Sequence, residues 1–324
     1  MKKIRLIVLL IVLSVVFSSC SVLPSMRENR EETTKINPLP EAANKIGKEV
    51  TLYFRYIDEN MLAGETRNID VPVNERIEMT VLNEIFNGPS QDSQELFAVI
   101  PENASIVSVS DSGDYLFVTL SAEFISESKL AAVQIEDEEA YTKAKEEMNL
   151  CIYSVVNTLI ELGGFSRIQI LIDTNDSGRG ERIKLIDIGV ESLEGASLEP
   201  LGWDGSLILN PENTVGLLLE VFGKRDFEKL YSLIAYNDSE NINSPSKDEF
   251  IGNLSSLETS IEEHSVLDSK VSADGQSVIV PVSFTQKNKN GDTITKDNII
   301  LKLRRERNLW KVEYSSFKNV FLQE

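Results

Sequence analysis

The sequence predicts an α+β fold in two domains, and three features of its hydrophobic pattern lead to that class. Apolar residues alternate in TLYFRYID, residues 51–58, as in a half-buried strand. Apolar residues recur at helical spacing from about Glu138 to Leu162. After Pro211, helical patterns are followed by several strand patterns in a row. Strands and helices therefore mix in the first part of the chain and follow one another in blocks in the second.

The first twenty residues have the layout of a secretory signal. A basic start with Lys2, Lys3 and Arg5 precedes an apolar run from Leu6 to Phe17. The run is about twelve residues long, whereas a helix that spans a bilayer needs about twenty. We therefore predict a signal peptide over residues 1–19 and no transmembrane helix there.

The next feature is the cysteine that follows this signal. Phe17, Ser18, Ser19 and Cys20 resemble a lipobox, the site at which lipoproteins receive a diacylglyceryl group on the cysteine thiol. The resemblance implies cleavage before Cys20 and lipid attachment at that residue. Each buried methylene adds about 0.8 kcal/mol, so two or three acyl chains would anchor the protein stably. Residues 20–48 are polar and carry several prolines, which predicts a flexible stalk.

A first domain is predicted over residues 49–190. Its expected elements are a strand at 51–58, an extended stretch at 65–73, a helix from an Asn74 cap to Phe86, a β-hairpin that turns at Asp111, Ser112 and Gly113, the long helix to Leu162, and strands at 167–173 and 184–190. This order of strands and helices predicts an α/β sandwich.

Several phrases of this domain resemble one family in the same order along the chain. They are a helix that ends in NGP at 87–89, AVIPENASIVSV at 98–109, VTLSAEF at 118–124 and VNTLIELGGFSRIQILID at 156–173. Together they look like the GerMN domain of spore-germination and sporulation lipoproteins. The resemblance implies an extracytoplasmic, ring-building-motif-like domain in an endospore-forming bacterium. The family includes tandems of two such domains, and one is visible in this sequence.

A second domain is predicted over 211–324, after a linker at 191–210 that has little periodicity and several Gly and Pro residues. Helices are expected from Pro211, at 226–234 and at 247–261, and strands at 265–272, 277–286, 293–304 and 310–317. Asn290 followed by Gly291 predicts a hairpin. Pro281 predicts a sheet edge or a bulge, because proline cannot donate to a strand ladder.

Helices followed by an antiparallel meander suggest a curved sheet that wraps a helix. The element order and the final phrase LWKVEY, residues 309–314, resemble the cone-shaped fold of the nuclear transport factor two and SnoaL-like superfamily. In that superfamily the cone serves as an enzyme pocket, a ligand pocket or a scaffold. The resemblance therefore implies a C-terminal α+β cone with a curved antiparallel sheet and leaves its use open.

Charge and cysteine content limit the classes of partner. The formal net charge is −20, so nucleic acid and anionic headgroups would repel the chain, and the membrane link is assigned to the lipid. Once Cys20 carries lipid, Cys151 has no partner for an intramolecular disulfide, and a zinc site built from several cysteines is excluded. The place of Cys151 on the long helix predicts a buried core residue.

The residue patterns predict no catalytic, cofactor-binding or metal site. His264 is the single histidine and has no accompanying nucleophile motif, so a structural or exposed role is expected. Asp173 opens a stretch like a calcium loop, but Lys184 stands where an EF-hand needs Glu, so a polar turn is expected. The acids from Glu136 to Glu139 are expected to cap the long helix. Phe54 and Tyr56 should pack the core.

The expected function is that of a non-enzymatic, membrane-anchored lipoprotein of sporulation or spore germination. It would act as a protein-docking or assembly module in the cell envelope. The expected partners are envelope or sporulation-complex proteins, with a homo-oligomer left open. A second hypothesis is a ligand-binding module whose cone holds a small molecule or a cell-wall fragment. A third is a cell-wall hydrolase, suggested only by the expected location and the 52 acidic residues, since glycan cleavage uses a pair of carboxylates.

Overall fold

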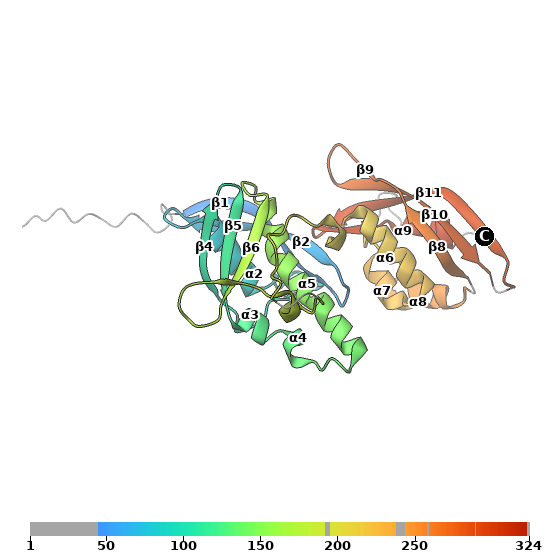
Figure 1. Cartoon of the computed structure of the whole chain (residues 1–324). Helices are drawn as coiled ribbons and strands as arrows, with labels where there is room; N and C mark the ends of the chain where they lie inside the picture. The colour runs from blue at the N-terminus through green and yellow to red at the C-terminus, as the bar shows by residue number, and fades with distance from the viewer. Residues whose placement is uncertain (1–44, 192–194, 238–243, 258, 289, 323–324) are drawn as a thin grey trace, which may run out of the picture. The chain divides into compact units, whose positions relative to one another are not determined.

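The computed structural model describes residues 45–191, 195–237, 244–257, 259–288 and 290–322 (Figure 1). The signal peptide, Cys20 and nearly all of the stalk lie outside these residues. Within the described ranges, no helix is long and apolar enough to cross a membrane.

The N-terminal region, residues 45–191, contains two sheets and one long helix. Its elements are β1 (Lys45–Tyr56), β2 (Leu62–Pro72), α2 (Ile77–Asn87), β3 (Leu96–Phe97), β4 (Ile106–Ser112), β5 (Tyr115–Ser121), α3 (Glu123–Ser126), α4 (Lys129–Ala132), α5 (Glu138–Glu161), β6 (Arg167–Asp173), β7 (Glu181–Arg182) and the 3₁₀ turn η3 (Leu185–Ile188). One sheet has the order β2-β1-β3 and the other has the order β4-β5-β6-β7.

The sheet β4-β5-β6-β7 is built around a crossover through α5. Strands β5 and β6 pair in parallel, with Tyr115 opposite Arg167 and Ser121 opposite Asp173. Parallel neighbours need a connection that crosses one face of the sheet, and α3, α4 and α5 supply it. Figure 1 shows α5 lying along these strands. Alternate residues of both strands, such as Val118 and Ile170, are buried in the core that α5 covers.

Two predictions for this region hold to within one residue, and two others are wrong. Helix α5 and strand β6 lie where the pattern placed them. Asn74 does not cap α2, because Glu75 N–H bonds the Pro72 carbonyl in a turn and the helix begins only at Ile77. The predicted strand at 184–190 is instead η3, which ends at Gly189 with φ +73°. A β-strand cannot pass through that left-handed conformation, so the chain turns there.

Helix α5 fastens itself to β1 through polar side chains that are fully buried. Ser154 Oγ donates to the Tyr53 carbonyl at 2.6 Å, and Tyr53 N–H donates to Thr158 Oγ1 at 3.0 Å. These bonds give both backbone groups of Tyr53 a side-chain partner. The small hydroxyl side chains one turn apart on α5 therefore have a structural role.

The segment before the second region is held by hydrogen bonds from α5. The buried Asn157 side chain accepts from Asp204 N–H at 3.0 Å and donates to the Asp204 carbonyl at 2.9 Å. Trp203 packs edge-on against Tyr53, with ring centroids 5.7 Å apart. Leu209 N–H donates to the Leu62 carbonyl at 2.7 Å. The last residues of the predicted linker thus have a defined backbone path.

The C-terminal region, residues 205–322, consists of helices packed on one curved antiparallel sheet. Its elements are the 3₁₀ turn η4 (Gly205–Leu207), α6 (Pro211–Gly223), α7 (Phe227–Ser232), α8 (Lys247–Ser255), β8 (Ser260–Val266), β9 (Lys270–Val271), β10 (Ser277–Lys287), β11 (Thr293–Glu306), β12 (Leu309–Val312) and α9 (Tyr314–Phe321). The sheet order is β12-β11-β10-β8, with β9 also paired to β10. The predicted α+β class and the C-terminal antiparallel sheet are confirmed.

Several C-terminal boundaries differ from the prediction for identifiable reasons. Helix α8 ends at Ser255, and β8 starts at Ser260 because its backbone pairs with the second half of β10, where Ser260 lies opposite Lys287. The last predicted strand stops at Val312, and the residues after it form α9. Tyr314, Phe317 and Phe321 are spaced three and four apart, which brings them to one face of a helix.

Pro281 lies in an interior strand, so its predicted place at a sheet edge or bulge is wrong. It pairs with Ile300 of β11 on one side of β10, one residue before the register shift between Val282 and Phe284. On the other side its carbonyl accepts from Leu267 N–H, at the break between β8 and β9. Because N and O of one residue point the same way in a strand, the missing N–H faces that break.

The Asn290–Gly291 hairpin is confirmed. Residues around 288–292 connect β10 to β11, and Gly291 N–H donates to the Asn288 carbonyl at 3.0 Å. Gly291 has φ +87°, the conformation for which glycine is required in such turns.

Candidate functional site

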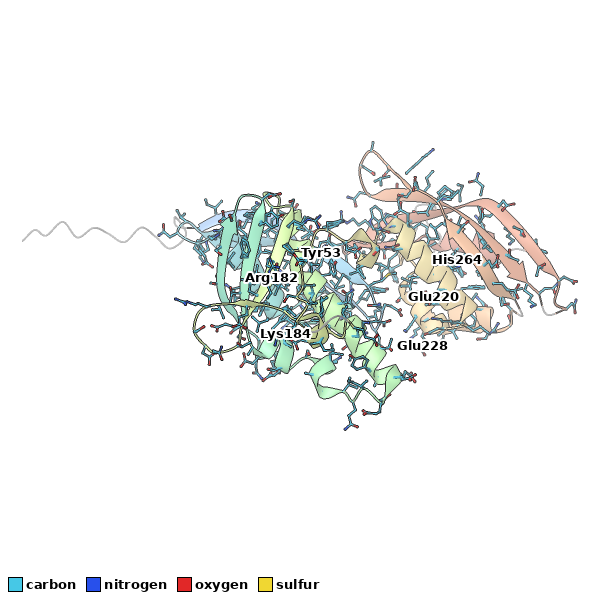
Figure 2. All side chains as sticks on the ribbon, viewed as in Figure 1. Tyr53, Arg182, Lys184, Glu220, Glu228 and His264 are labelled. Carbon is cyan, nitrogen blue, oxygen red and sulfur yellow. The ribbon has the colours of Figure 1, made fainter. Side chains whose placement is uncertain are left out.

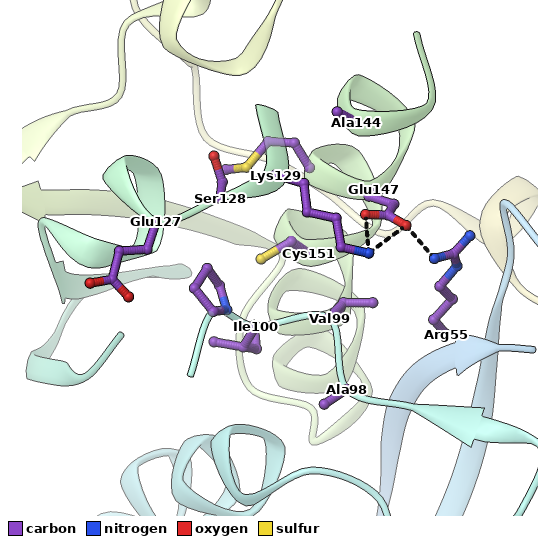
Figure 3. A pocket seen from close by; sticks show the side chains of 12 residues that line it. Arg55, Ala98, Val99, Ile100, Glu127, Ser128, Lys129, Ala144, Glu147 and Cys151 are labelled. Atoms are coloured by element: carbon purple, nitrogen blue, oxygen red, sulfur yellow. Dashed lines mark hydrogen bonds and ion pairs between the residues drawn. The ribbon is translucent and has the colours of Figure 1, made fainter. Parts of the chain in front are cut away.

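A pocket of about 200 Å³ opens beside Cys151 in the N-terminal region (Figure 3). Four segments that are distant in the sequence form its walls: β1, the stretch after β3, the turn between α3 and α4, and the middle of α5. The lining residues are Arg55, Ala98, Val99, Ile100, Pro101, Glu127, Ser128, Lys129, Ala144, Glu147, Met148 and Cys151.

Helix α5 supplies the apolar floor together with one acid. Ala144, Glu147, Met148 and Cys151 follow one another at spacings of three, one and three residues, so all four lie on one face of the helix. Ala144, Met148 and Cys151 are buried in the core. The Glu147 carboxylate interrupts this apolar face, and only 12 % of its side chain is exposed. A buried acid needs partners, and these come from the other walls.

The turn between α3 and α4 fixes the position of Lys129. Ser128 is buried and caps α4, with its Oγ accepting from Ala131 N–H at 3.2 Å and donating to the Ile125 carbonyl at 2.7 Å. Lys129 is therefore the first residue of α4, and its Nζ lies 2.8 Å from Glu147 Oε2. The Lys129 side chain is nevertheless 75 % exposed at the pocket mouth.

Arg55 completes the charged side of the pocket from β1. Its Nη1 bonds the Glu147 carboxylate, and its Nη2 lies 2.9 Å from Asp58 Oδ1. Its Nε donates to the Glu59 carbonyl at 3.0 Å, so each of the three guanidinium nitrogens has a hydrogen-bond partner. Glu147 is thus held between Arg55 and Lys129, as the dashed lines in Figure 3 show.

Two groups near the pocket have shifted pKa values. Burial raises the pKa of the Cys151 thiol far above its usual range, so the thiol stays protonated and unreactive at neutral pH. The hydrogen bond from Lys143 is the main cause that lowers the pKa of Asp58, which is therefore ionised at neutral pH. The prediction that Cys151 is a buried core residue is confirmed by its exposed fraction of 2 %.

The residues singled out from the sequence do not gather in this pocket, apart from Cys151. His264 lies within β8 opposite Phe284 and is exposed, as Figure 2 marks. Asp137 caps α5 by accepting from Ala140 N–H at 3.1 Å, and Glu138 and Glu139 occupy its first turn. Across the described part of the chain, no group of three or more His, Cys, Asp or Glu side chains is arranged to hold a metal ion.

The Asp173 carboxylate is used by its own loop. Oδ1 accepts from Ser177 N–H at 3.0 Å and Ser177 Oγ at 3.2 Å, and Oδ2 accepts from Gly178 N–H at 2.6 Å. Burial acts to raise the pKa of Asp173, but hydrogen bonds from the N–H groups of Ser177, Gly178 and Asn175 outweigh it and lower the pKa. Both oxygens point at backbone donors, which confirms the predicted polar turn.

Aromatic rings fill the interior of the C-terminal region. Phe317 lies 4.9 Å from Phe321 and 5.5 Å from Phe250 between ring centroids, and Phe222 lies 5.1 Å from Phe321. All four side chains are buried. Helix α9 thus inserts its rings between α6, α8 and the sheet. This packing speaks against the hypothesis that the cone holds a ligand.

Sequence reasoning missed Arg55, Lys129 and Glu147. Arg55 is 92 residues from Glu147 in the sequence, and Lys129 is 18 residues from it. No sequence spacing relates a strand to the helices that pack on it. One signal was available, because Glu147 falls within the apolar face of α5 between Ala144 and Met148. An acid in such a position indicates a partnered charge at the edge of a core.

A comparison with protein-family models identifies the N-terminal region. Residues 51–176 match the family Germane, described as "Sporulation and spore germination". The resemblance predicted from the phrases of the sequence is therefore confirmed over these residues, which we call the Germane segment. The pocket lies within the Germane segment. No curated protein matches the chain in sequence.

Solved structures resemble the chain in parts. A candidate lipoprotein from Clostridium perfringens is 18 % identical over 50 % of this chain and 91 % of its own, with a TM-score of 0.25. The tandem GerMN domains of the sporulation protein GerM from Bacillus subtilis are 12 % identical over 54 % of this chain and 51 % of theirs, with a TM-score of 0.32. An NTF2-like protein from Cytophaga hutchinsonii is 20 % identical over 31 % and 87 %, with a TM-score of 0.23. With TM-scores this low, no functional conclusion follows from these likenesses.

Proposed function

We propose that this chain is a non-enzymatic lipoprotein of sporulation or spore germination, which acts as a protein-docking or assembly module in the cell envelope. The observation that carries the proposal is the match of residues 51–176 to the Germane family of sporulation and spore germination.

Anchoring through Cys20 is part of the proposal. The basic start, the apolar run and the lipobox-like residues before Cys20 support lipid attachment on the extracytoplasmic face. A tether of this kind raises the local concentration of the protein near envelope partners, which favours docking over long-range capture.

The chemistry of the described residues supports a non-enzymatic role. The thiol of Cys151 is buried and protonated, and Asp173 is occupied by backbone donors. Glu147 is compensated by two cations. These groups hold structure together and are poorly placed to exchange protons with a substrate.

Pull-down from sporulating cells tests the docking role. The full chain with an affinity tag is expected to recover one defined set of envelope proteins, identified by mass spectrometry after crosslinking. The Cys20→Ala chain should lose membrane association and much of that set, while Ser21→Ala, next to the lipid site, should behave as the unchanged protein. The proposal is wrong if the tagged chain enriches no protein above the control and a deletion strain sporulates and germinates normally.

A further inference from the structure

We propose that the pocket beside Cys151 binds a small carboxylate with a compact apolar body. The proposal stands apart from the docking role, because it concerns the interior of the Germane segment and not its partners. It follows from three properties of the pocket: its size, its apolar floor, and an exposed cation at its mouth, Lys129, whose partner Glu147 also binds a second cation.

The size of the pocket sets the bulk of the ligand. Its volume is about 200 Å³. An apolar protein cavity of about 150 Å³ accommodates benzene. The pocket therefore suits one ring, or a branched chain of similar bulk, together with a short arm that carries a polar group.

The floor of the pocket favours an apolar body. Val99, Ile100, Met148 and Cys151 all line it. The neutral thiol of Cys151 behaves as a small apolar group, and the flexible thioether of Met148 adapts to the shape of a neighbour. Aromatic rings also make favourable contacts with such sulfur atoms. A ring is thus better matched to this floor than a polar group would be.

The mouth of the pocket favours an anion. Lys129 is 75 % exposed, and Glu147 is its hydrogen-bond and ion-pair partner in the pocket. If Lys129 turns toward a ligand, Glu147 keeps its bond to Arg55, so no buried charge is left uncompensated. A cationic ligand would find Glu147 already paired with two cations. Glu127, the other acid of the lining, accepts from Asn103 at 2.8 Å but keeps its charge, so a cationic probe tests whether Lys129 or Glu127 dominates the mouth.

Neighbouring acids limit the affinity. Glu139 and Glu146 line a separate hollow that shares Arg55 and Glu147 with the pocket. Their charge and the net charge of −20 oppose an anion, although salt at physiological strength screens charges beyond about 8 Å. For a ligand of about ten heavy atoms we expect a Kd of about 1 mM.

Phenylacetate is the probe for this site, and methionine methyl groups report on it. The chain has five methionines, of which Met148 lines the pocket. We expect titration of the full-length, ¹³C-methyl-methionine-labelled chain to shift the Met148 resonance in a saturable way. Met148→Leu identifies that resonance by its disappearance. 2-Phenylethanol, which is neutral, and 2-phenylethylamine, which is cationic, should bind at least about tenfold more weakly, a difference of about 1.4 kcal/mol.

Two variants connect binding to named residues. Lys129→Gln removes the cation at the mouth and should weaken phenylacetate binding about tenfold, to the level of the neutral alcohol. Lys145→Gln, an exposed lysine on α5 that does not line the pocket, is the matched control and should bind as the unchanged chain. Ala144→Leu should fill the pocket and abolish the Met148 shift.

The proposal is overturned if phenylacetate at about 10 mM leaves the Met148 resonance in place, since a Kd of about 1 mM predicts near-saturation there. It is equally overturned if the amine binds as tightly as the acid, or if Lys129→Gln binds as well as Lys145→Gln. These outcomes do not depend on whether Ala144→Leu folds. They also leave the pull-down result untouched, so the two proposals fail separately.

Discussion

The contacts of each carboxylate oxygen decide what that residue does in this chain. Asp173 looks like the start of a calcium loop in the sequence, yet its oxygens accept backbone hydrogen bonds from Ser177 and Gly178. Glu147 looks like one more acid on a charged helix, yet it joins Arg55 and Lys129 at a pocket. Residue type alone separates neither case from the many other acids of the chain.

Replacing Asp173 with Ala should lower the melting temperature. Asp173 is 3 % exposed, and its removal leaves the N–H groups of the loop without their acceptor. Addition of calcium should leave the melting temperature of the unchanged chain where it is, because no oxygen of Asp173 is available to a cation. Differential scanning calorimetry of both chains with calcium and with a chelator checks the two statements. A calcium-dependent rise would contradict our interpretation of the loop.

Replacing Asn157 with Ala should lower the free energy of unfolding by about 2–4 kcal/mol, because the buried side chain holds both backbone groups of Asp204. Urea unfolding followed by circular dichroism measures the change. Asn103→Ala is the control, since that side chain makes an exposed bond to Glu127 and should matter by less than about 0.5 kcal/mol. Equal losses in the two variants would show that Asn157 has no special anchoring role.

At the scale of elements, the same residue pattern can serve two structures until packing selects one. The stretch from Tyr314 to Phe321 follows a strand and is rich in aromatic residues, which fits another strand. The structure makes it a helix, since this brings Phe317 and Phe321 together onto Phe222 and Phe250. The aromatic core of the C-terminal region therefore depends on α9.

Removing one ring of α9 should have a large effect. Phe317 is fully buried, so Phe317→Ala should lower the free energy of unfolding by about 3–5 kcal/mol. Lys318→Ala, on the exposed side of the same helix, should change it by less than about 0.5 kcal/mol. Chemical denaturation of both variants distinguishes these values. A loss below about 1 kcal/mol for Phe317→Ala would mean that α9 is not part of the core.

At the scale of the whole molecule, charge couples stability to pH in two directions. The net charge of −20 destabilises a compact chain through repulsion. Individual acids act the other way, because favourable contacts hold the pKa values of several carboxyls below their usual range. These are Asp58, Glu65, Glu123, Asp173, Glu212, Glu249 and Asp274.

Acid should therefore unfold the protein in a defined range. A carboxyl whose pKa is lower in the folded state contributes stability above its unfolded pKa of about 4, and that contribution is lost as the pH falls through the folded pKa. We expect the free energy of unfolding to decline below about pH 4. Between about pH 7 and 5 these carboxyls stay ionised in both states, so the free energy of unfolding should change little there.

Urea unfolding at a series of pH values measures this profile. Glu65→Gln is a useful comparison, because burial raises the pKa of Glu65 but bonds from Ser90 N–H and Arg67 outweigh it. The variant should be less stable at neutral pH and should lose less on acidification. Stability that climbs steadily down to about pH 2.5 would contradict the assignment of these carboxyls.

Local pattern was enough to place most elements and the fold class. The spacing of apolar residues located α5 and β6, and the Asn290–Gly291 pair located the hairpin between β10 and β11. The phrases of the first domain pointed to the family that residues 51–176 match. These features depend on residues close together in the chain, so the sequence by itself determined them.

Only the tertiary structure showed where the pocket lies, what Asn157 binds, and that residues 314–321 form a helix. Arg55, Val99, Lys129 and Glu147 meet because β1, α4 and α5 pack around one space. Their distances are set by how sheets and helices pack, which depends on the whole core and not on any local spacing. For the same reason the sequence could show that Cys151 is buried but not that a charged pair and a hollow lie beside it.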